Sequence, residues 1–270
     1  MRVRLGRRIG EHIVMAIGLV VLAYMFVPIV VVMLMSFNAP ASRQTYTFDA
    51  FTLDNWLQPC EPEGLCSSLV ISLQVGLLAT VGATALGTLM AFALVRHRFR
   101  GRGTANVVVF MPMASPEVVM GASLLALFVA TGFGGVLGFW TILIAHIMFC
   151  LSFVVVTVRA RLQGMDSRLE QAAMDLYATE WQAFWRVTFP LVFPGILSAA
   201  LLAFALSFDD FIVTNFNSGQ TVTFPMYVWG AAQRDVPMQI NVIGTAMFAI
   251  AVIVVLSGEL GRRRRPANAG

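Results

Sequence analysis

Long apolar runs alternate with short polar stretches along most of this chain. A helix needs about 20 apolar residues to cross the hydrocarbon core of a bilayer. We therefore predict six transmembrane helices, at approximately residues 13–35, 69–95, 106–130, 138–158, 195–216 and 240–256. The first run is longer than the roughly 7–15 apolar residues of a signal peptide. We expect it to be retained as a helix, although residues 39–41 loosely resemble a cleavage site.

Composition supports this interpretation. Of the 270 residues, 58% are hydrophobic and only 12% are charged, and the mean hydropathy is +0.80. A soluble domain carries about 25% charged residues. We predict a single all-α integral membrane domain over residues 1–270, embedded in a lipid bilayer. The basic residues lie in short clusters between apolar runs, which argues against a nucleic-acid partner.

The arginines separate strongly between the two sides of the predicted membrane. Every basic residue is Arg, and all but Arg43 and Arg234 fall in the N-terminus, the 96–103 loop, the 159–190 segment or the C-terminus. Basic residues concentrate in cytoplasmic loops. We therefore predict cytoplasmic N- and C-termini and a cytoplasmic segment 159–194 between the fourth and fifth spans.

Segment 159–194 is the longest polar interruption in the second half of the chain. It contains two S/T-x-x-E/Q capping boxes, at Ser167–Glu170 and Thr179–Gln182, and each marks a helix start. Pro190 and Pro194 limit how the second helix can continue. We predict two short amphipathic helices that lie beside the bilayer and are joined by a tight corner.

Three carboxylates fall within predicted spans: Glu117, Asp209 and Asp210. A charged side chain near the middle of a spanning helix costs at least about 2.5–3.5 kcal/mol. No Arg or Lys lies at matching depth, so a passing cation would neutralise them. Alternatively, Glu117 accepts hydrogen bonds from backbone freed by Pro116, and one aspartate is protonated or bonded to a neighbouring helix.

Aromatic residues near the predicted outer side could assist a cationic substrate. Tyr227 and Trp229 could offer ring faces to an amine by cation–π contact. Contact with lipid or with neighbouring helices is the commoner explanation for such residues. We include both in the candidate substrate pathway, together with the three acids.

The cysteines and histidines show no metal-ligand spacing, and we predict no metal site. Cys60 and Cys66 share one predicted outer loop, where an oxidising compartment permits a disulfide. Two unpaired thiols are an equal alternative. Cys150 is interpreted as a small apolar filler. For His146, alone in the fourth span, packing against a neighbouring helix is favoured over a proton relay.

The spacing within segment 159–194 matches a known pattern. Gln171-Ala172-Ala173, three residues, Tyr177, nine residues and then Val187-x-Phe189-Pro190 resemble the E-A-A, G, I-x-L-P loop of permease subunits of ATP-binding-cassette importers. The runs PMASPEVVMGASLL and SFDDFIVTNFNSG resemble the spermidine/putrescine, PotC-like branch of that family. The resemblance implies the type I (MetI-like) fold of six spans, with a coupling helix between spans four and five, in a bacterial cell membrane.

The resemblance also implies partners. These are a second, similar permease, two ATPase subunits that bind ATP and Mg²⁺, and an outside solute-binding protein. The chain itself has no G-x-x-x-x-G-K-[ST] loop, so we expect a transport subunit, not an enzyme, and no cofactor of its own. Alternatives are a permease for another small solute and a self-contained cation channel or secondary carrier. The residues expected to couple to the ATPase are Glu170, Gln171, Ala172, Ala173, Asp175, Tyr177 and Pro190.

Two positions depart from the family pattern. Gln171 replaces the usual Glu, although Glu170 stands beside it. Tyr177 replaces the usual Gly at the helix corner. Either Tyr177 adopts a left-handed conformation at about 1–2 kcal/mol, or the corner has ordinary dihedral angles and the ring joins the ATPase interface. We expect the second arrangement.

Overall fold

The computed structural model describes residues 2–41, 47–166 and 168–263, with side chains from residue 12 to residue 258. The chain divides into two compact units, Met1–Cys66 with Val228–Gly270, and Ser67–Tyr227. The described residues form helices and no strand; an isolated bridge pairs Asn38 with Phe51.

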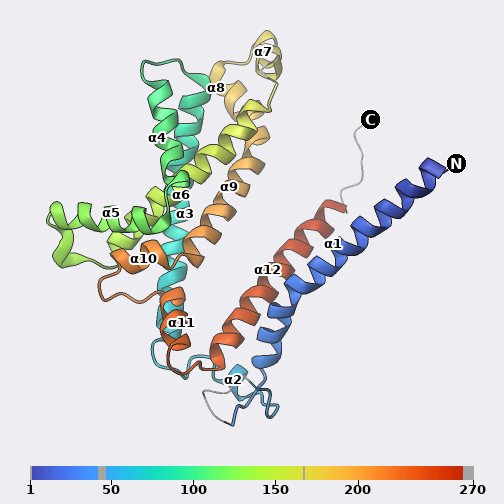
Figure 1. Cartoon of the computed structure of the whole chain (residues 1–270). Helices are drawn as coiled ribbons and strands as arrows, with labels where there is room; N and C mark the ends of the chain where they lie inside the picture. The colour runs from blue at the N-terminus through green and yellow to red at the C-terminus, as the bar shows by residue number, and fades with distance from the viewer. Residues whose placement is uncertain (1, 42–46, 167, 264–270) are drawn as a thin grey trace. The chain divides into compact units, whose positions relative to one another are not determined.

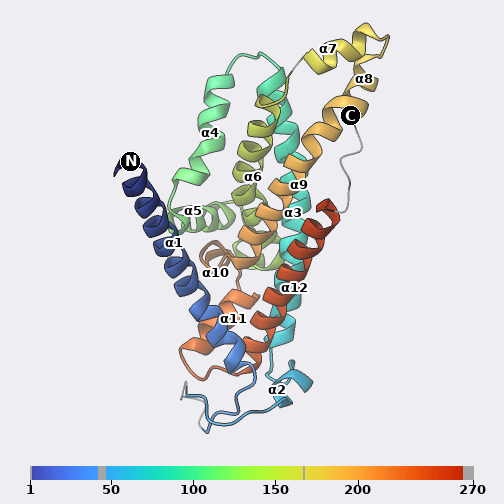
Figure 2. The same ribbon diagram turned by 90° about the vertical axis from the view of Figure 1, so that its right-hand side faces the viewer.

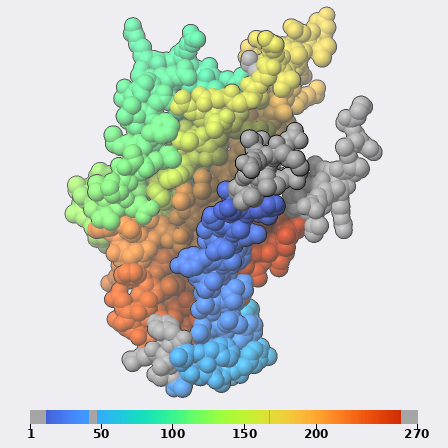
Figure 3. Space-filling view, turned by 45° about the vertical axis from the view of Figure 1, so that its right-hand side comes forward, coloured from blue at the N-terminus to red at the C-terminus, as the bar shows by residue number. Residues whose placement is uncertain are grey.

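The first unit is built on two long helices. α1 (Arg2–Met35) contacts α12 (Gln239–Arg263). The contact includes Pro28 and Val32 of α1 and Gly244 of α12, and Figure 2 shows the two helices diverging beyond it. Outside this contact, α1 exposes an apolar surface along most of its length (Figure 3). Such a surface suits lipid or another membrane protein, because water would penalise it.

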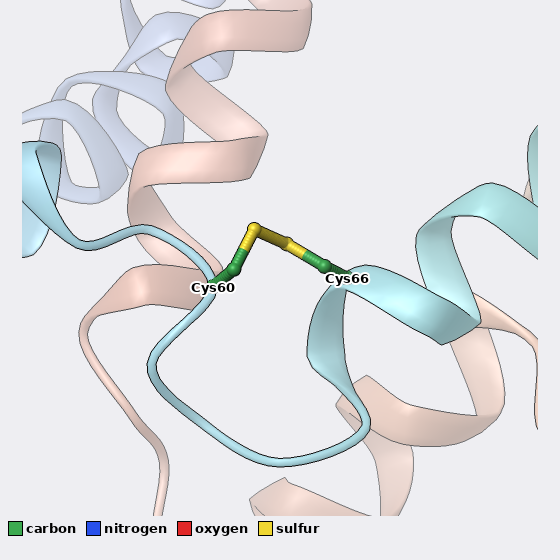
Figure 4. Close-up of a disulfide and its surroundings, with 2 residues drawn as sticks. All are labelled: Cys60 and Cys66. Atoms are coloured by element: carbon green, nitrogen blue, oxygen red, sulfur yellow. A yellow bond between two sulfur atoms is a disulfide. The ribbon is translucent and has the colours of Figure 1, made fainter.

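The loop that follows α1 is tied together by hydrogen bonds and a disulfide. Trp56, on the short helix α2 (Asp54–Leu57), donates its Nε1–H to Ser36 Oγ at 3.2 Å. Cys60 and Cys66 form a disulfide, so the structure favours the bonded alternative (Figure 4). Gln239 Nε2, at the start of α12, donates to Glu61 Oε2 at 2.9 Å within this loop.

The second unit holds α3 from Ser67 onward, the helices that follow it through α10, and the start of α11. Its core forms where α3, α4, α6 and α9 run side by side (Figures 1 and 2). The elements, in chain order, are α3 (Leu65–Arg96), α4 (Arg102–Ala114), α5 (Glu117–Ala130), a 3₁₀ turn (Phe133–Val136), α6 (Phe139–Gln163), α7 (Arg168–Asp175), α8 (Glu180–Ala183), a π turn (Phe184–Thr188), α9 (Phe189–Asp209), α10 (Ile212–Asn217) and α11 (Phe224–Ala232).

Small residues let α3 approach its neighbours closely, as expected for helix packing in membranes. Ala79, Ala83 and Ala91 are completely buried. A Cβ atom on Gly87 would lie 2.7 Å from Val154 Cγ1 on α6, closer than real Cβ contacts allow.

Among the described residues, five helical stretches are long and apolar enough to span a membrane, and there are six if a bent pair counts as one span. The five are His12–Met35, Leu65–Arg96, Phe139–Gln163, Glu180–Asp209 and Gln239–Gly258. The bent pair, α4 and α5, turns by 111°. The segment predicted as the third span, 106–130, is therefore divided into two helices. Ser115 precedes Pro116, which disfavours helical dihedrals, and its ψ is 139°.

The fifth span differs from the prediction at both ends. Helical structure runs unbroken from Glu180 through Asp209, so the second amphipathic helix is the start of the span and not a separate element. A π turn just before Pro190 accommodates its missing N–H donor. The span ends at Asp209, and α10 is a separate short helix, because the chain is extended at Asp210 (φ −67°, ψ 123°).

Candidate functional site

The break between α9 and α10 is held together by the carboxylate of Asp210. The first N–H groups of a helix have no partner within it, and in apolar surroundings they must find one. Val213 N–H donates to Asp210 Oδ1 at 3.3 Å, and Thr214 N–H donates to Oδ2 at 2.8 Å. The Thr214 hydroxyl also donates to Oδ2, at 2.9 Å. Asp210 thus supplies the acceptors that α10 requires.

His146 connects this break to α6. Its Nε2 lies 2.8 Å from Thr214 Oγ1 and 3.3 Å from Asp210 Oδ2, and its Nδ1 lies 2.7 Å from Ser207 Oγ. All four residues are buried, and the His146 side chain is only 1% exposed. Because Thr214 O–H donates to Asp210, its oxygen accepts from the Nε2–H of His146. The network joins three helices: α6, α9 and α10.

The expected acids meet at one hollow of about 470 Å³ in this unit. Glu117, Asp209 and Asp210 all line it. Glu117 and Asp209 are exposed, and within the described residues neither carboxylate forms a hydrogen bond or an ion pair. Glu117 lies in the first turn of α5, where the helix dipole favours a negative charge. The backbone hydrogen bonds considered as its alternative role are not formed.

The two aromatic candidates lie elsewhere. Tyr227 and Trp229 are on α11 and do not line the hollow, and Trp229 belongs to the other compact unit. No pattern in the sequence paired His146 with Asp210, and the structure brings the two together. One signal for this pairing was present in the sequence. His146 is a titratable residue inside an apolar span, and such residues usually have a polar partner on a neighbouring helix.

A second polar cluster joins α7 to the ends of two spans. Both terminal nitrogens of Arg96, at the end of α3, hydrogen-bond to the carboxylate of Glu170, and the Thr188 hydroxyl donates to the same carboxylate. The Arg96 hydrogen bonds lower the pKa of Glu170, partial burial opposes this, and Thr188 lowers it further. The first predicted capping box cannot be assessed, because Ser167 lies outside the described residues.

The second capping box is confirmed. Gln182 N–H donates to Thr179 Oγ1 at 3.3 Å, and Thr179 N–H donates to Gln182 Oε1 at 3.1 Å. Trp181, Phe184 and Trp185 contact one another edge-on or stacked. This aromatic group fixes the start of the fifth span next to α7.

The corner after α7 departs from our expectation. Tyr177 has φ +64°, so the expected ordinary dihedral angles are wrong. Tyr177 N–H donates to Met174 O, and Ala178 N–H donates to Ala173 O. These two bonds form a Schellman motif, which requires a left-handed residue at this position. The motif satisfies the last carbonyls of α7, and this offsets the strain of a bulky left-handed residue.

The expected coupling residues form an exposed surface. Gln171, Ala172, Asp175 and Pro190 are exposed, and Tyr177 is 97% exposed. Beside them, a hollow of about 510 Å³ is lined by Arg96, Glu170 and Phe184, among others. An almost fully exposed aromatic ring at a helix corner is suited to contact with another protein.

Comparisons with known proteins agree with this architecture. A family model described as "Binding-protein-dependent transport system inner membrane component" matches residues 83–260. The spermidine/putrescine transport system permease protein PotC of Haemophilus influenzae is 35% identical over 246 residues, 91% of this chain and 94% of that protein. The putrescine transport system permease protein PotI of Escherichia coli K12 is 35% identical over 238 residues, 86% of this chain and 84% of that protein.

A solved structure supports the fold. It is that of a bacterial alginate ABC transporter in complex with an alginate pentasaccharide-bound periplasmic protein. The matching chain has a TM-score of 0.68 and 15% sequence identity, with 98% of this chain and 97% of that chain covered. At this identity the similarity concerns the fold alone.

Proposed function

The chain belongs to the family of binding-protein-dependent transport system inner membrane components, and from this we propose that it forms one half of a pathway that imports spermidine or putrescine. Members of this family are multi-pass membrane permease subunits, not enzymes. The observation that supports this most directly is the hollow of about 470 Å³, at which the carboxylates of Glu117 and Asp209 are exposed and have no partner among the described residues. Polyamines are cations, and carboxylates without a partner of their own attract them. Two relatives carry spermidine or putrescine in their names.

The proposed assembly follows from the family. The second half of the pathway would come from a similar, PotB-like permease. A pair of PotA-like ATPase subunits would bind ATP and Mg²⁺, and a PotD-like solute-binding protein would deliver the substrate. The exposed corner around Tyr177 would contact the ATPase, because it presents an apolar surface on a short helix outside the spans.

We also propose that both termini face the cytoplasm and that residues 1–270 act as one transmembrane domain. The separation of the arginines supports the orientation. In this proposed orientation, the Arg96–Glu170 cluster and Tyr177 would lie on the cytoplasmic side, where ATP is available. The disulfide between Cys60 and Cys66 then lies outside, where oxidising conditions preserve it.

The test is ATP hydrolysis by the whole reconstituted complex, with its binding protein and a series of solutes. Spermidine or putrescine should stimulate hydrolysis, while an uncharged sugar and an anionic oligosaccharide should not. Asp209→Asn should weaken the stimulation by polyamine, with Ala205→Ser, at the same hollow, as the matched control. Stimulation by a sugar or an anion in place of a polyamine would refute the proposed substrate.

A further inference from the structure

Asp209 and Asp210 are adjacent in the sequence, yet their surroundings differ. The Asp209 side chain is exposed at the hollow and, within the described residues, unpaired. The Asp210 side chain is only 3% exposed and accepts two N–H bonds and one hydroxyl bond. A carboxylate has about four acceptor positions, so little of Asp210 is left to bind a ligand.

We propose that Asp210 and His146 are positioning residues that fix the break between α9 and α10, so that Asp209 presents its carboxylate to the hollow. The inference rests on the proposed function, and it assigns Asp209 and Asp210 to different roles. A substrate amine would contact Asp209, while Asp210 would contact only the protein.

The break between α9 and α10 explains why the two adjacent aspartates have different roles. A continuous helix through residue 212 would turn each successive side chain by about 100°, and no residue would need to cap α10. At the break the chain is extended at Asp210, which frees N–H groups that its carboxylate then satisfies. Asp209, the last residue of α9, takes its direction from this geometry.

His146 connects the break to α6. Its ring bridges Ser207, three residues before the break, and Thr214, four residues after it. The neighbouring packing is close. Asn217 Nδ2 donates to Gly121 O, and a Cβ on Gly121 would lie 2.8 Å from Phe216. The position of α10 is therefore fixed against both α5 and α6, and the hollow lies between α5, α6 and α9.

The experiment compares single and double variants in the full complex, reconstituted with its binding protein. Asp209→Asn should raise the KM for polyamine-stimulated ATP hydrolysis about tenfold or more, because it removes a charge-assisted contact. The thermal unfolding temperature of the permease should be unchanged. His146→Gln should raise KM and also lower the unfolding temperature.

The decisive variant combines the two. If His146 acts through Asp209, His146→Gln should raise KM no further in the Asp209→Asn background, although it still lowers the unfolding temperature. Thr214→Val should behave as His146→Gln does, and Thr214→Ser, which keeps the hydroxyl, should restore the wild-type KM. An independent KM effect of His146→Gln in the Asp209→Asn background would overturn the proposal. So would an Asp210→Asn variant that raises KM and leaves thermal stability unchanged.

A measurement without substrate separates this inference from the proposed function. The one free cysteine of the described chain, Cys150, is buried, so Asp209→Cys provides a single reactive thiol. A positively charged methanethiosulfonate should modify it readily, whereas Val213→Cys, at a fully buried position, should be protected. Absent polyamine stimulation in the wild type would refute the proposed substrate alone. Protection of the thiol at position 209 would overturn the inference, whatever the substrate.

Discussion

Two carboxylates in the second unit are held by side chains from other helices, and they are held in different ways. Glu170, outside the spans, pairs with Arg96, whose guanidinium is charged at every physiological pH. Asp210, within the helical core, pairs with His146 and with backbone N–H groups. The first arrangement is an ion pair partly open to solvent, with side chains 33% and 17% exposed. The second is a buried polar network.

The difference indicates two tasks. A partly exposed ion pair contributes little stability, but it can link two helices. A buried network that satisfies its groups rigidifies the helices it joins. We therefore interpret Arg96–Glu170 as a link between the proposed coupling surface and α3, and Asp210–His146 as a fixed support for Asp209, the acid that we propose faces the substrate.

Removal of the buried carboxylate should have the largest effect. Asp210→Ala removes the carboxylate that accepts from Val213 N–H, Thr214 N–H and the Thr214 hydroxyl, and it should destabilise the permease by about 3 kcal/mol or more. Thermal unfolding of the purified complex measures this. Asp209→Ala is the matched control and should change stability by less than about 0.5 kcal/mol. Equal effects of the two variants would remove the distinction between them.

Reversal of the exposed pair should have a smaller effect that can be rescued. Arg96→Glu places two carboxylates together and should reduce ATP-driven transport, with a stability loss of about 1 kcal/mol. Adding Glu170→Arg restores an attractive pair. Transport assays on proteoliposomes, with each single and the double variant, provide the measurement. A double variant no better than Arg96→Glu would show that the link between helices is not what transport needs.

Substitutions at Tyr177 distinguish the effect of backbone strain from the effect of contact between the ring and a partner protein. Tyr177→Gly should stabilise the isolated permease by about 1 kcal/mol, because Gly accepts a positive φ without strain. Loss of the exposed ring should nevertheless weaken ATPase association, measured by copurification. Tyr177→Phe keeps the ring and should retain association. Unchanged association in Tyr177→Gly would exclude the ring from the ATPase interface.

The smallest effect concerns pH. The pKa of Glu170 is lowered below its ordinary value of 4.5, chiefly by hydrogen bonds from Arg96. The contribution of the pair to stability is therefore complete above pH 4.5 and is lost as the pH falls through the lowered pKa. The unfolding temperature of the wild type should fall below pH 4.5 more steeply than that of Glu170→Gln. Parallel curves of unfolding temperature against pH for the two proteins would show that the Glu170 carboxylate has the same pKa in the folded and unfolded states.

The tertiary structure differs from the sequence prediction where helices break. The sequence contains Pro116 and Pro190, but only Pro116 lies at a helix break. At Pro116 the chain turns by 111°, while at Pro190 a π turn absorbs the missing donor and the helix continues. Whether a proline kinks, breaks or is absorbed depends on what the neighbouring helices offer to the freed backbone groups, and this is not encoded near the proline itself.

The sequence by itself determined the apolar spans, the family resemblance of segment 159–194 and the three acids within predicted spans, which the structure brings to one hollow. These features are local, because each depends on hydrophobicity, spacing or a charge that is out of place in a span. Only the tertiary structure decided the roles of the acids. Asp209 and Asp210 are the same residue type at adjacent positions, and what separates them is His146, more than 60 residues away, together with the break that Asp210 caps. Partners brought together across helices satisfy a buried carboxylate, and no pattern along the chain specifies which of two neighbours receives them.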